Sequence, residues 1–370
     1  MWWRAARARR RIAGARTAST AAAAAEKSCR AVVVPRFGGP EVLEVRQGVP
    51  VPDLKPGQVL VRARAVSINP LDLRMRSGYG RSIFEPILPL IIGRDISGEV
   101  AATGTSASLF TIGQEVFGAL HPTAIRGTYT DYAILSQDEL TPKPSTLTHA
   151  EASAIPFAAL TAWRALYGTA RISEGQRVLV IGGGGAVGLS AVQLAVAAGC
   201  SVSATCGTQS IEQVLSAGAE KAIDYTAEDT ESAVKGKFDA VLDTIGVPET
   251  ERVGINVLRR GGHYMTLQIS APSSRLTIFY FMDAILYRSY ICDLSYCVFE
   301  MLSCSSNVTS DYWWTYMRAD AEGLHEIQRL SGAGKLQIPV EKTFPVCQVR
   351  EAHEAKEKRL VPGKVVLEFD

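Results

Sequence analysis

Short runs of alternating or wholly apolar residues, broken by glycine and proline, make up the chain from Cys29 to about Ala154. An apolar residue at every second position is typical of strands with one buried face, so this region predicts an antiparallel β domain. Between Thr148 and Gly168 the apolar spacing becomes helical despite Pro156. From there strands and helices alternate to about Leu267, which predicts a doubly wound parallel sheet.

The C-terminal segment returns to the first pattern. It predicts a strand, a charged helix at about Val349–Leu360, a Pro-Gly turn and a final strand. We therefore expect the chain to complete its first domain here, with the parallel-sheet domain inserted between two segments. The predicted limits are 29–155 together with 335–370 for the β domain, and 156–334 for the inserted domain.

A glycine-rich turn joins a buried strand, Val178–Ile181, to an apolar helix ending near Gly199. Gly183, Gly185 and Gly188 have the G-x-G-x-x-G spacing that holds a dinucleotide diphosphate at a helix N-terminus. We assign the first glycine to the tight turn, the second to close approach of the phosphates and the third to packing of the helix on the strand. The predicted cofactor cradle is Gly183, Gly184, Gly185, Ala186, Val187 and Gly188.

A second short strand, Ser201–Thr205, follows, and the residues after it bear on the cofactor's identity. NAD-selective sites place a carboxylate about 20 residues past the first glycine, where it binds the ribose 2′-hydroxyl. No Asp or Glu occurs from Gly182 to Ile211, and Gly207, Thr208 and Ser210 leave room for a 2′-phosphate. NADPH is therefore favoured over NADH. No Arg or Lys occurs there either, and the same hydroxyls also fit ordinary turn chemistry.

The composition fits two domains and a separate N-terminal segment. The chain has 370 residues, and this length exceeds what one hydrophobic core usually supports. Its residues are 47% hydrophobic and 21% charged, an ordinary globular balance. The first 28 residues hold seven Lys or Arg and no acid before Glu26, which predicts a mitochondrial presequence for the matrix. The alternative is a disordered basic tail. The remainder has 32 basic and 36 acidic residues, so it lacks the basic footprint of nucleic-acid binding.

Cysteine and histidine spacing predicts neither a metal site nor a hydrolase. None of the seven cysteines forms a C-x-x-C pair or a spacing that would close a tetrahedral zinc site. They are interpreted as free thiols, with Cys292, Cys297 and Cys304 packed in an aromatic stretch. No spacing pairs one of the five histidines with a nucleophilic Ser or Cys.

Four segments resemble the medium-chain dehydrogenase/reductase superfamily, in its zinc-free quinone oxidoreductase branch: Val66–Gly80, Leu90–Val100, Ile155–Leu166 and Ala333–Pro345. The resemblance covers nearly everything after the first 28 residues. It implies an α/β fold, with a Rossmann-type sheet domain inserted into a GroES-like β domain. The G-H-E motif of zinc alcohol dehydrogenases is replaced here by Gly93-Arg94-Asp95, so alcohol oxidation through a metal is not expected.

The same resemblance implies hydride transfer from NADPH to a quinone or an activated enone. It places Asn69 beside the nicotinamide, Thr161 at the ring's carboxamide and Tyr225 at the adenosine 2′-phosphate, with Leu267 also in the cofactor site. Each has an alternative role. Asn69 would be a turn residue before Pro70, Thr161 a helix-interior hydroxyl bonded to its own backbone, and Tyr225 a strand-end aromatic packed on the sheet. Arg74 departs from relatives, which often have tyrosine or asparagine there, so the acceptor pocket is expected to differ.

An aromatic stretch, Leu276–Met317, leaves several interpretations open. Charged residues interrupt it, so no apolar run reaches the roughly 20 residues of a membrane span. The interpretations are buried core, a homodimer interface, and a groove for an isoprenoid quinone tail with contact to the inner membrane. Two alternative functions also stay open: an NADPH-binding scaffold or redox sensor with little turnover, and an alkenal or enone reductase. The resemblance implies a link to ubiquinone metabolism.

Overall fold

The computed structural model describes residues 28–107, 109–234, 236–268, 311–358 and 363–370. The predicted presequence lies outside these residues except for Ser28. So does the aromatic stretch up to residue 310, together with its three cysteines. No helix among the described residues is both long and apolar enough to cross a membrane.

The first domain is built on a seven-stranded sheet that both ends of the chain share. Its order is β14-β15-β3-β4-β5-β7, β6 also pairs with β3, and β1 and β2 form a separate hairpin. In β3 most side chains are buried, because neighbouring strands and helices cover it on both faces. The strands are β1 (Ser28–Val33), β2 (Glu44–Pro50), β3 (Gln58–Ser67), β4 (Asp95–Thr103), β5 (Glu115–Ala119), β6 (Tyr132–Ser136), β7 (Leu140–Pro142), β14 (Val340–Pro345) and β15 (Lys364–Glu368).

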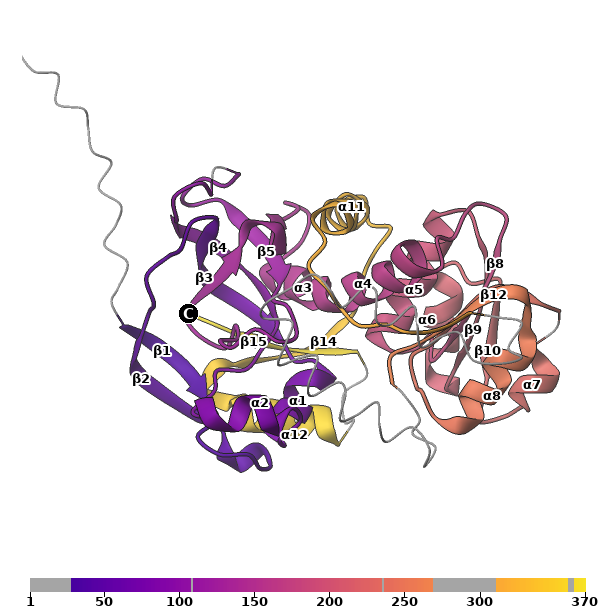
Figure 1. The fold of residues 1–370 in the computed structure, drawn as a ribbon, viewed down its shortest axis with the longest axis horizontal. Coiled ribbons are helices and arrows are strands. Elements are labelled where there is room, and N and C mark those ends of the chain that lie inside the picture. The colour runs from indigo at the N-terminus through magenta and orange to yellow at the C-terminus, as the bar shows by residue number, and fades with distance from the viewer. Residues whose placement is uncertain (1–27, 108, 235, 269–310, 359–362) are drawn as a thin grey trace, which may run out of the picture.

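The C-terminal segment completes this domain, as predicted. β15 pairs antiparallel with β3, with Val366 opposite Ser67, and parallel with β14. Figure 1 shows the yellow C-terminal elements lying among the indigo elements of the N-terminal part. The predicted charged helix is observed as α12 (Val349–Glu357). The domain limits at 155/156 and 334/335 stay a prediction.

The inserted domain holds a six-stranded parallel sheet of order β10-β9-β8-β11-β12-β13. The chain runs outward from β8 to β10 and then resumes on the other side of β8 with β11, so the strand order reverses beside β8. In open α/β sheets ligands bind at this switch point, beyond the carboxyl ends of the strands. The strands are β8 (Arg177–Ile181), β9 (Ser201–Cys206), β10 (Lys221–Asp224), β11 (Phe238–Asp243), β12 (Leu258–Thr266) and β13 (Asp311–Trp314).

Helices cover both sides of this sheet and join it to the first domain (Figure 1). The helical stretch predicted from Thr148 to Gly168 is divided at Pro156 into α3 and α4 and ends in a π-helix, η4. The α-helices and η4 are α1 (Pro70–Arg76), α2 (Arg81–Phe84), α3 (His149–Ala154), α4 (Pro156–Trp163), η4 (Arg164–Thr169), α5 (Ala186–Ala197), α6 (Ile211–Ser216), α7 (Thr230–Ala233), α8 (Pro248–Val257), α11 (Ala321–Gly332) and α12. The 3-10 turns are η1 (Pro40–Val42), η2 (Glu85–Ile87), η3 (Gln137–Glu139), η5 (Thr208–Ser210) and η6 (Val346–Gln348).

Helix α5 is apolar on nearly all sides because it lies between the sheet and α4. Leu189, Val192 and Leu194 are almost completely buried in one cluster with side chains of β8 and α4. The helix ends before Gly199, whose φ of 77° only glycine adopts easily. The doubly wound sheet inserted into a β domain is therefore confirmed, and its first helix has its N-terminus at the switch point.

Candidate active site

A cavity of about 1720 Å³ opens between the two domains at the carboxyl ends of the parallel strands. The end of β3, helix α4, the glycine turn and the segment after β13 all contribute to its wall. The described residues that line it include no Asp or Glu. The Arg and Lys side chains among them are Arg74, Arg164, Arg171, Arg318, Lys356 and Lys364. A wall with this charge suits a polyanionic ligand such as a dinucleotide.

The glycines of the turn have different roles. A Cβ atom on Gly188 would lie 2.1 Å from the carbonyl oxygen of Gly182, so this glycine lets α5 pack closely on the strand. On Gly185 the nearest atom would be 3.6 Å away, which is ordinary contact. Gly185 also lines the cavity, so the space beside it is available to a ligand rather than filled by protein.

The turn role predicted for Gly183 belongs to its neighbour. Gly182 has the left-handed φ of 84°, and a Cβ there would lie 2.3 Å from Thr244 Oγ1. Gly183 is required for packing instead, since its Cβ would come within 2.8 Å of the Ala204 Cβ. The assignment of the tight turn to Gly183 is therefore wrong, because the sharp change of direction occurs one residue earlier.

The N-terminus of α5 has the backbone groups that an anion needs. The first-turn N–H groups of Ala186, Val187 and Gly188 have no acceptor within the helix, and these residues line the cavity. The loop is held in place because Thr205 accepts from the Gly183 and Gly182 N–H groups, through its carbonyl oxygen at 2.7 Å and its Oγ1 at 3.1 Å. The cradle thus fits a diphosphate group at the positive end of the helix.

At the far end of the cradle, Gly207, Ser210 and Tyr225 line the cavity. Tyr225 is 60% exposed, so it is not the strand-end aromatic packed on the sheet that the alternative interpretation expected. Gly183 and Thr208 are the two predicted site residues that are not part of the lining.

The Thr208 hydroxyl is engaged elsewhere, because it donates to Asp224 Oδ2 at 2.6 Å. Asp224, at the end of β10, lies outside the segment after β9 in which such a carboxylate is expected, and the pairing of β10 with β9 brings it beside Thr208. Hydrogen bonds from Thr208 and Thr226 hold the pKa of Asp224 below its usual value, so it stays ionised beside this end of the site.

Asn69 and Thr161, the two predicted catalytic residues, both line the cavity from opposite domains. Asn69 is the residue before α1, and its side chain bonds to Asp95 and Lys364. The Thr161 hydroxyl donates to the Phe157 carbonyl oxygen at 2.7 Å, which is the backbone bond that the alternative role foresaw. Its oxygen can still accept a hydrogen bond from a ligand. The catalytic roles of both residues stay predictions.

The aromatic side of the cavity comes from β13 and the residues after it. Trp313 to Met317 line the cavity, and the Trp314 indole N–H donates to the Leu267 carbonyl oxygen at 3.3 Å. Leu267 itself lines the cavity, as predicted. The described end of the aromatic stretch is thus cavity wall. The alternatives for its remainder concern residues outside the described ones.

His121 lies in the same wall but is unsuited to donate a proton at neutral pH. Burial, together with the charges of Arg318, Arg94 and Arg164, lowers the pKa of His121 to about 4. Its Nδ1 atom lies 2.8 Å from Thr123 Oγ1. The ring is therefore neutral and held by a local hydrogen bond.

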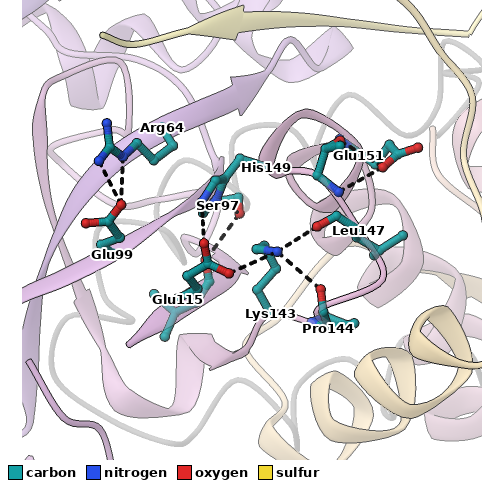
Figure 2. Close-up of polar contacts among 11 residues, drawn as sticks. Arg64, Ser97, Glu99, Glu115, Lys143, Pro144, Leu147, His149 and Glu151 are labelled. Atoms are coloured by element: carbon teal, nitrogen blue, oxygen red, sulfur yellow. Dashed lines mark hydrogen bonds and ion pairs between the residues drawn. The ribbon is translucent and has the colours of Figure 1, made fainter. Parts of the chain in front are cut away.

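One pairing that the sequence did not predict is Ser97, His149 and Glu115 (Figure 2). His149 Nδ1 lies 2.8 Å from Ser97 Oγ, and its Nε2 lies 3.2 Å from Glu115. Sequence spacing could not indicate this contact, because β4, β5 and α3 bring together residues far apart in sequence. Ser97 is fully buried and does not line the cavity, so no substrate reaches it and a hydrolase is still not indicated.

Within the described part of the chain, no three His, Cys, Asp or Glu side chains gather closely enough to hold a metal ion. The four cysteines described there, at positions 29, 200, 206 and 347, are free thiols. The polar side chains at the cavity carry amide, hydroxyl, imidazole, guanidinium and ammonium groups, and backbone N–H groups of the glycine turn add to them.

Comparison with known proteins gives similarity over nearly the whole chain. Residues 55–145 match the family described as alcohol dehydrogenase GroES-like domain, and residues 217–367 match the family described as zinc-binding dehydrogenase. The cattle (Bos taurus) protein named NAD(P)H oxidoreductase RTN4IP1, mitochondrial, is 32% identical over 364 residues, covering 90% of this chain and 88% of the relative. The tomato (Solanum lycopersicum) 2-methylene-furan-3-one reductase is 34% identical over 280 residues, covering 71% and 70%.

Among solved structures, the quinone oxidoreductase from Coxiella burnetii superposes with a TM-score of 0.76 at 27% identity. The match covers 93% of this chain and 100% of that chain. The predicted combination of a GroES-like domain and a Rossmann-type sheet is confirmed.

Proposed function

Because this chain belongs to the medium-chain dehydrogenase/reductase superfamily, among its quinone-oxidoreductase-like members, we propose that it is an NADPH-dependent reductase of quinones or activated enones. The observation that carries the proposal concerns Gly185, at the N-terminus of α5. A Cβ there would make only ordinary contact with the protein, and the residue lines the same cavity as Asn69 and Thr161. Membership of this family supports the general activity, that of an NAD(P)H oxidoreductase.

Each part of the site has a task in this reaction. Bound NADPH supplies the hydride. The first turn of α5 binds the diphosphate, while Gly207, Ser210 and Tyr225 leave space for the 2′-phosphate. The Thr161 oxygen accepts from the nicotinamide carboxamide, which orients the ring.

Asn69 acts on the acceptor. Its Nδ2 group carries a second N–H beyond the one bonded to Asp95, and this N–H donates to the acceptor oxygen as negative charge develops there. Ile68, Phe84 and Trp314 give the wall an apolar surface that reduces access of water to the reacting atoms.

The proposal also covers the protein's setting. We place it in the mitochondrial matrix, with a link to ubiquinone metabolism. Support comes from the arginine-rich first 28 residues and from the word mitochondrial in the cattle relative's name. The proposal extends to the predicted domain limits, homodimer formation and peripheral contact with the inner membrane. The substrate is a small quinone or enone, as the names of the relatives suggest.

The test is consumption of NADPH by the purified full chain with a panel of small quinones and α,β-unsaturated ketones. We expect turnover with at least one acceptor class and its loss in Gly185→Val, since the added side chain fills the space for the diphosphate. Gly332→Val is the matched control. This glycine lies at the end of α11, outside the cavity lining, and a Cβ there comes no nearer than 3.4 Å to Pro144.

The outcomes separate the candidate functions. Turnover with quinones alone supports a quinone reductase, and turnover with enones alone supports the alkenal reductase alternative. Tight NADPH binding without turnover on any acceptor would contradict the enzyme and support the scaffold. Equal losses of turnover in Gly185→Val and Gly332→Val would contradict the proposed role of the glycine turn in cofactor binding.

A further inference from the structure

A buried cluster of four polar side chains lies beside the cavity: Ser67 at the end of β3, Asn69, Asp95 at the start of β4 and Lys364 at the start of β15. The Lys364 ammonium group donates to Ser67 Oγ at 2.8 Å, to Asn69 Oδ1 at 2.7 Å and to Asp95 Oδ2 at 3.0 Å. Ser67 Oγ donates in turn to Asp95 Oδ2 at 2.6 Å. All three N–H groups of the ammonium are therefore used within the cluster.

These contacts define which way the Asn69 amide faces. An ammonium group can only donate, so the atom of Asn69 that faces Lys364 is the oxygen. An ionised carboxylate can only accept, so the atom that faces Asp95 is the nitrogen, at 2.7 Å. The opposite orientation of the amide would place its NH2 group against the Lys364 ammonium and its oxygen against the Asp95 carboxylate, so neither hydrogen bond could form. One N–H of the amide is left, and it is the group that the proposed reaction uses.

Asp95 also reaches across to the other domain. Its Oδ1 accepts from the backbone N–H of Phe157 at 2.7 Å, in the first turn of α4. Thr161 lies one turn further along this helix, and α4 shares a hydrophobic core with the parallel sheet. One carboxylate therefore binds both the Asn69 side chain and the helix that carries Thr161.

We propose that Lys364 and Asp95 are positioning residues. Together they fix the Asn69 amide and the start of α4, so that the two groups predicted to contact acceptor and cofactor face one another across the cavity. This inference rests on the proposed function for its catalytic meaning, while its geometric part stands without it.

The ion pair's contribution is geometric rather than one of net stability. The Lys364 and Asp95 side chains are 2% and 0% exposed. For a pair as buried as this, the cost of desolvating two charges offsets most of their attraction. A neutral pair of similar shape, Asp95→Asn with Lys364→Met, would therefore fold. It would lack the ammonium donor to Asn69, and its single amide oxygen could not accept from both the Asn69 side chain and the Phe157 N–H.

The test compares two double variants of the full chain. Asp95→Asn with Lys364→Met removes both charges and leaves no unpaired buried charge. The control, Glu115→Gln with Lys143→Met, alters another ion pair of a buried lysine in the same domain, which lies outside the cavity lining (Figure 2). Measurements are kcat with 1,2-naphthoquinone at saturating NADPH, the isotope effect from deuterium at the transferred position, and the affinity for 2′,5′-ADP.

We expect kcat of the Asp95→Asn/Lys364→Met variant to fall about a hundredfold, the loss typical of reacting groups misplaced by about 1 Å. The isotope effect should rise, because hydride transfer becomes slower than product release. Binding of 2′,5′-ADP, which lacks the nicotinamide, should stay within about twofold. Unchanged kcat and isotope effect, or an equal loss in the control, would overturn the proposal.

Two further arms keep the proposal falsifiable. If the double variant does not fold, Ser67→Ala removes one hydrogen bond from Lys364 and one from Asp95 while both charges remain, and an unchanged kcat in this variant overturns the inference. If the wild-type protein consumes no NADPH with any acceptor, the proposed function fails, and a crystal structure of the double variant decides the geometric part. A rotated Asn69 amide supports that part, and an amide in its original place overturns it.

Discussion

Asp72 shows how strongly a single buried residue is affected by this site. Its carboxylate is fully buried and accepts from the Asn69 backbone N–H at 2.8 Å. Burial raises the pKa of Asp72 to about 6, and the charge of Asp95 adds to the rise. Arg94, Lys364 and the Asn69 hydrogen bond act in the opposite direction but only in part. The group therefore titrates just below neutral pH in the folded protein.

This shift predicts a pH-dependent difference between wild type and Asp72→Asn. The folded state holds the Asp72 proton more tightly than the unfolded chain, where the pKa is near 3.8. Raising the pH from 4 to above 6 removes this stabilising proton, so wild type loses free energy of unfolding relative to the variant. The expected loss over this range is about 2 kcal/mol.

Urea unfolding of both proteins at a series of pH values measures this difference. Arg94, Asp95 and Lys364, together with the buried Tyr129, face the same carboxyl group, and they are present in both proteins. The comparison therefore isolates the effect of the Asp72 carboxyl group. A difference that is constant between pH 4 and 7, or that grows in favour of wild type, would contradict the assignment.

At the scale of elements, the glycine turn between β8 and α5 contains glycines with two different roles. Gly182 and Gly188 let the backbone adopt a left-handed turn and let the helix approach the strand, so the fold itself requires them. Gly185 has ordinary space around its Cβ position, so the fold does not require it. The absence of a side chain there matters only for what enters the cavity.

This distinction predicts opposite behaviour for two alanine variants. Gly188→Ala forces a Cβ against the Gly182 carbonyl oxygen and should lower the free energy of unfolding by about 1–3 kcal/mol. Gly185→Ala should change it by less than about 0.5 kcal/mol and weaken NADPH binding. Chemical denaturation without cofactor and a binding titration measure the two effects. Equal destabilisation in both variants would contradict the division of roles.

Local patterns predicted these elements well because the relevant interactions are local. Strand β8, helix α5 and strand β9 lie within one or two residues of their predicted limits, since apolar runs and glycine stops determine them. The left-handed residue was misplaced by one position because all four consecutive glycines allow the turn. At Gly182 the turn is fixed by contacts from the loop after β11, where the Thr244 hydroxyl bonds to the Ile181 and Gly182 carbonyl oxygens.

At the scale of the whole molecule, the site is completed by the last residues of the chain. Lys364 meets Asp95, which lies 269 positions earlier in the sequence, because β15 joins the sheet of the first domain beside β3. Asp95 stands in the Gly93-Arg94-Asp95 segment and Lys364 follows the Pro-Gly turn, but no pattern in the sequence links the two residues. The Ser97 and His149 pair was missed for the same reason. Sequence patterns thus predicted the glycine turn before α5 and singled out Asn69, but they did not indicate the other members of the polar cluster around Asn69.

The central claim for the whole molecule is that the cavity between its domains binds a nicotinamide dinucleotide at the N-terminus of α5. The most direct test is calorimetric titration of the full chain with NADPH and with NADH, repeated on Gly185→Val and on Gly332→Val. We expect one NADPH to bind per chain, more tightly than NADH. Gly185→Val should lose the binding and Gly332→Val should keep it. Absence of binding heat with either coenzyme, or unchanged binding in Gly185→Val, would contradict the claim.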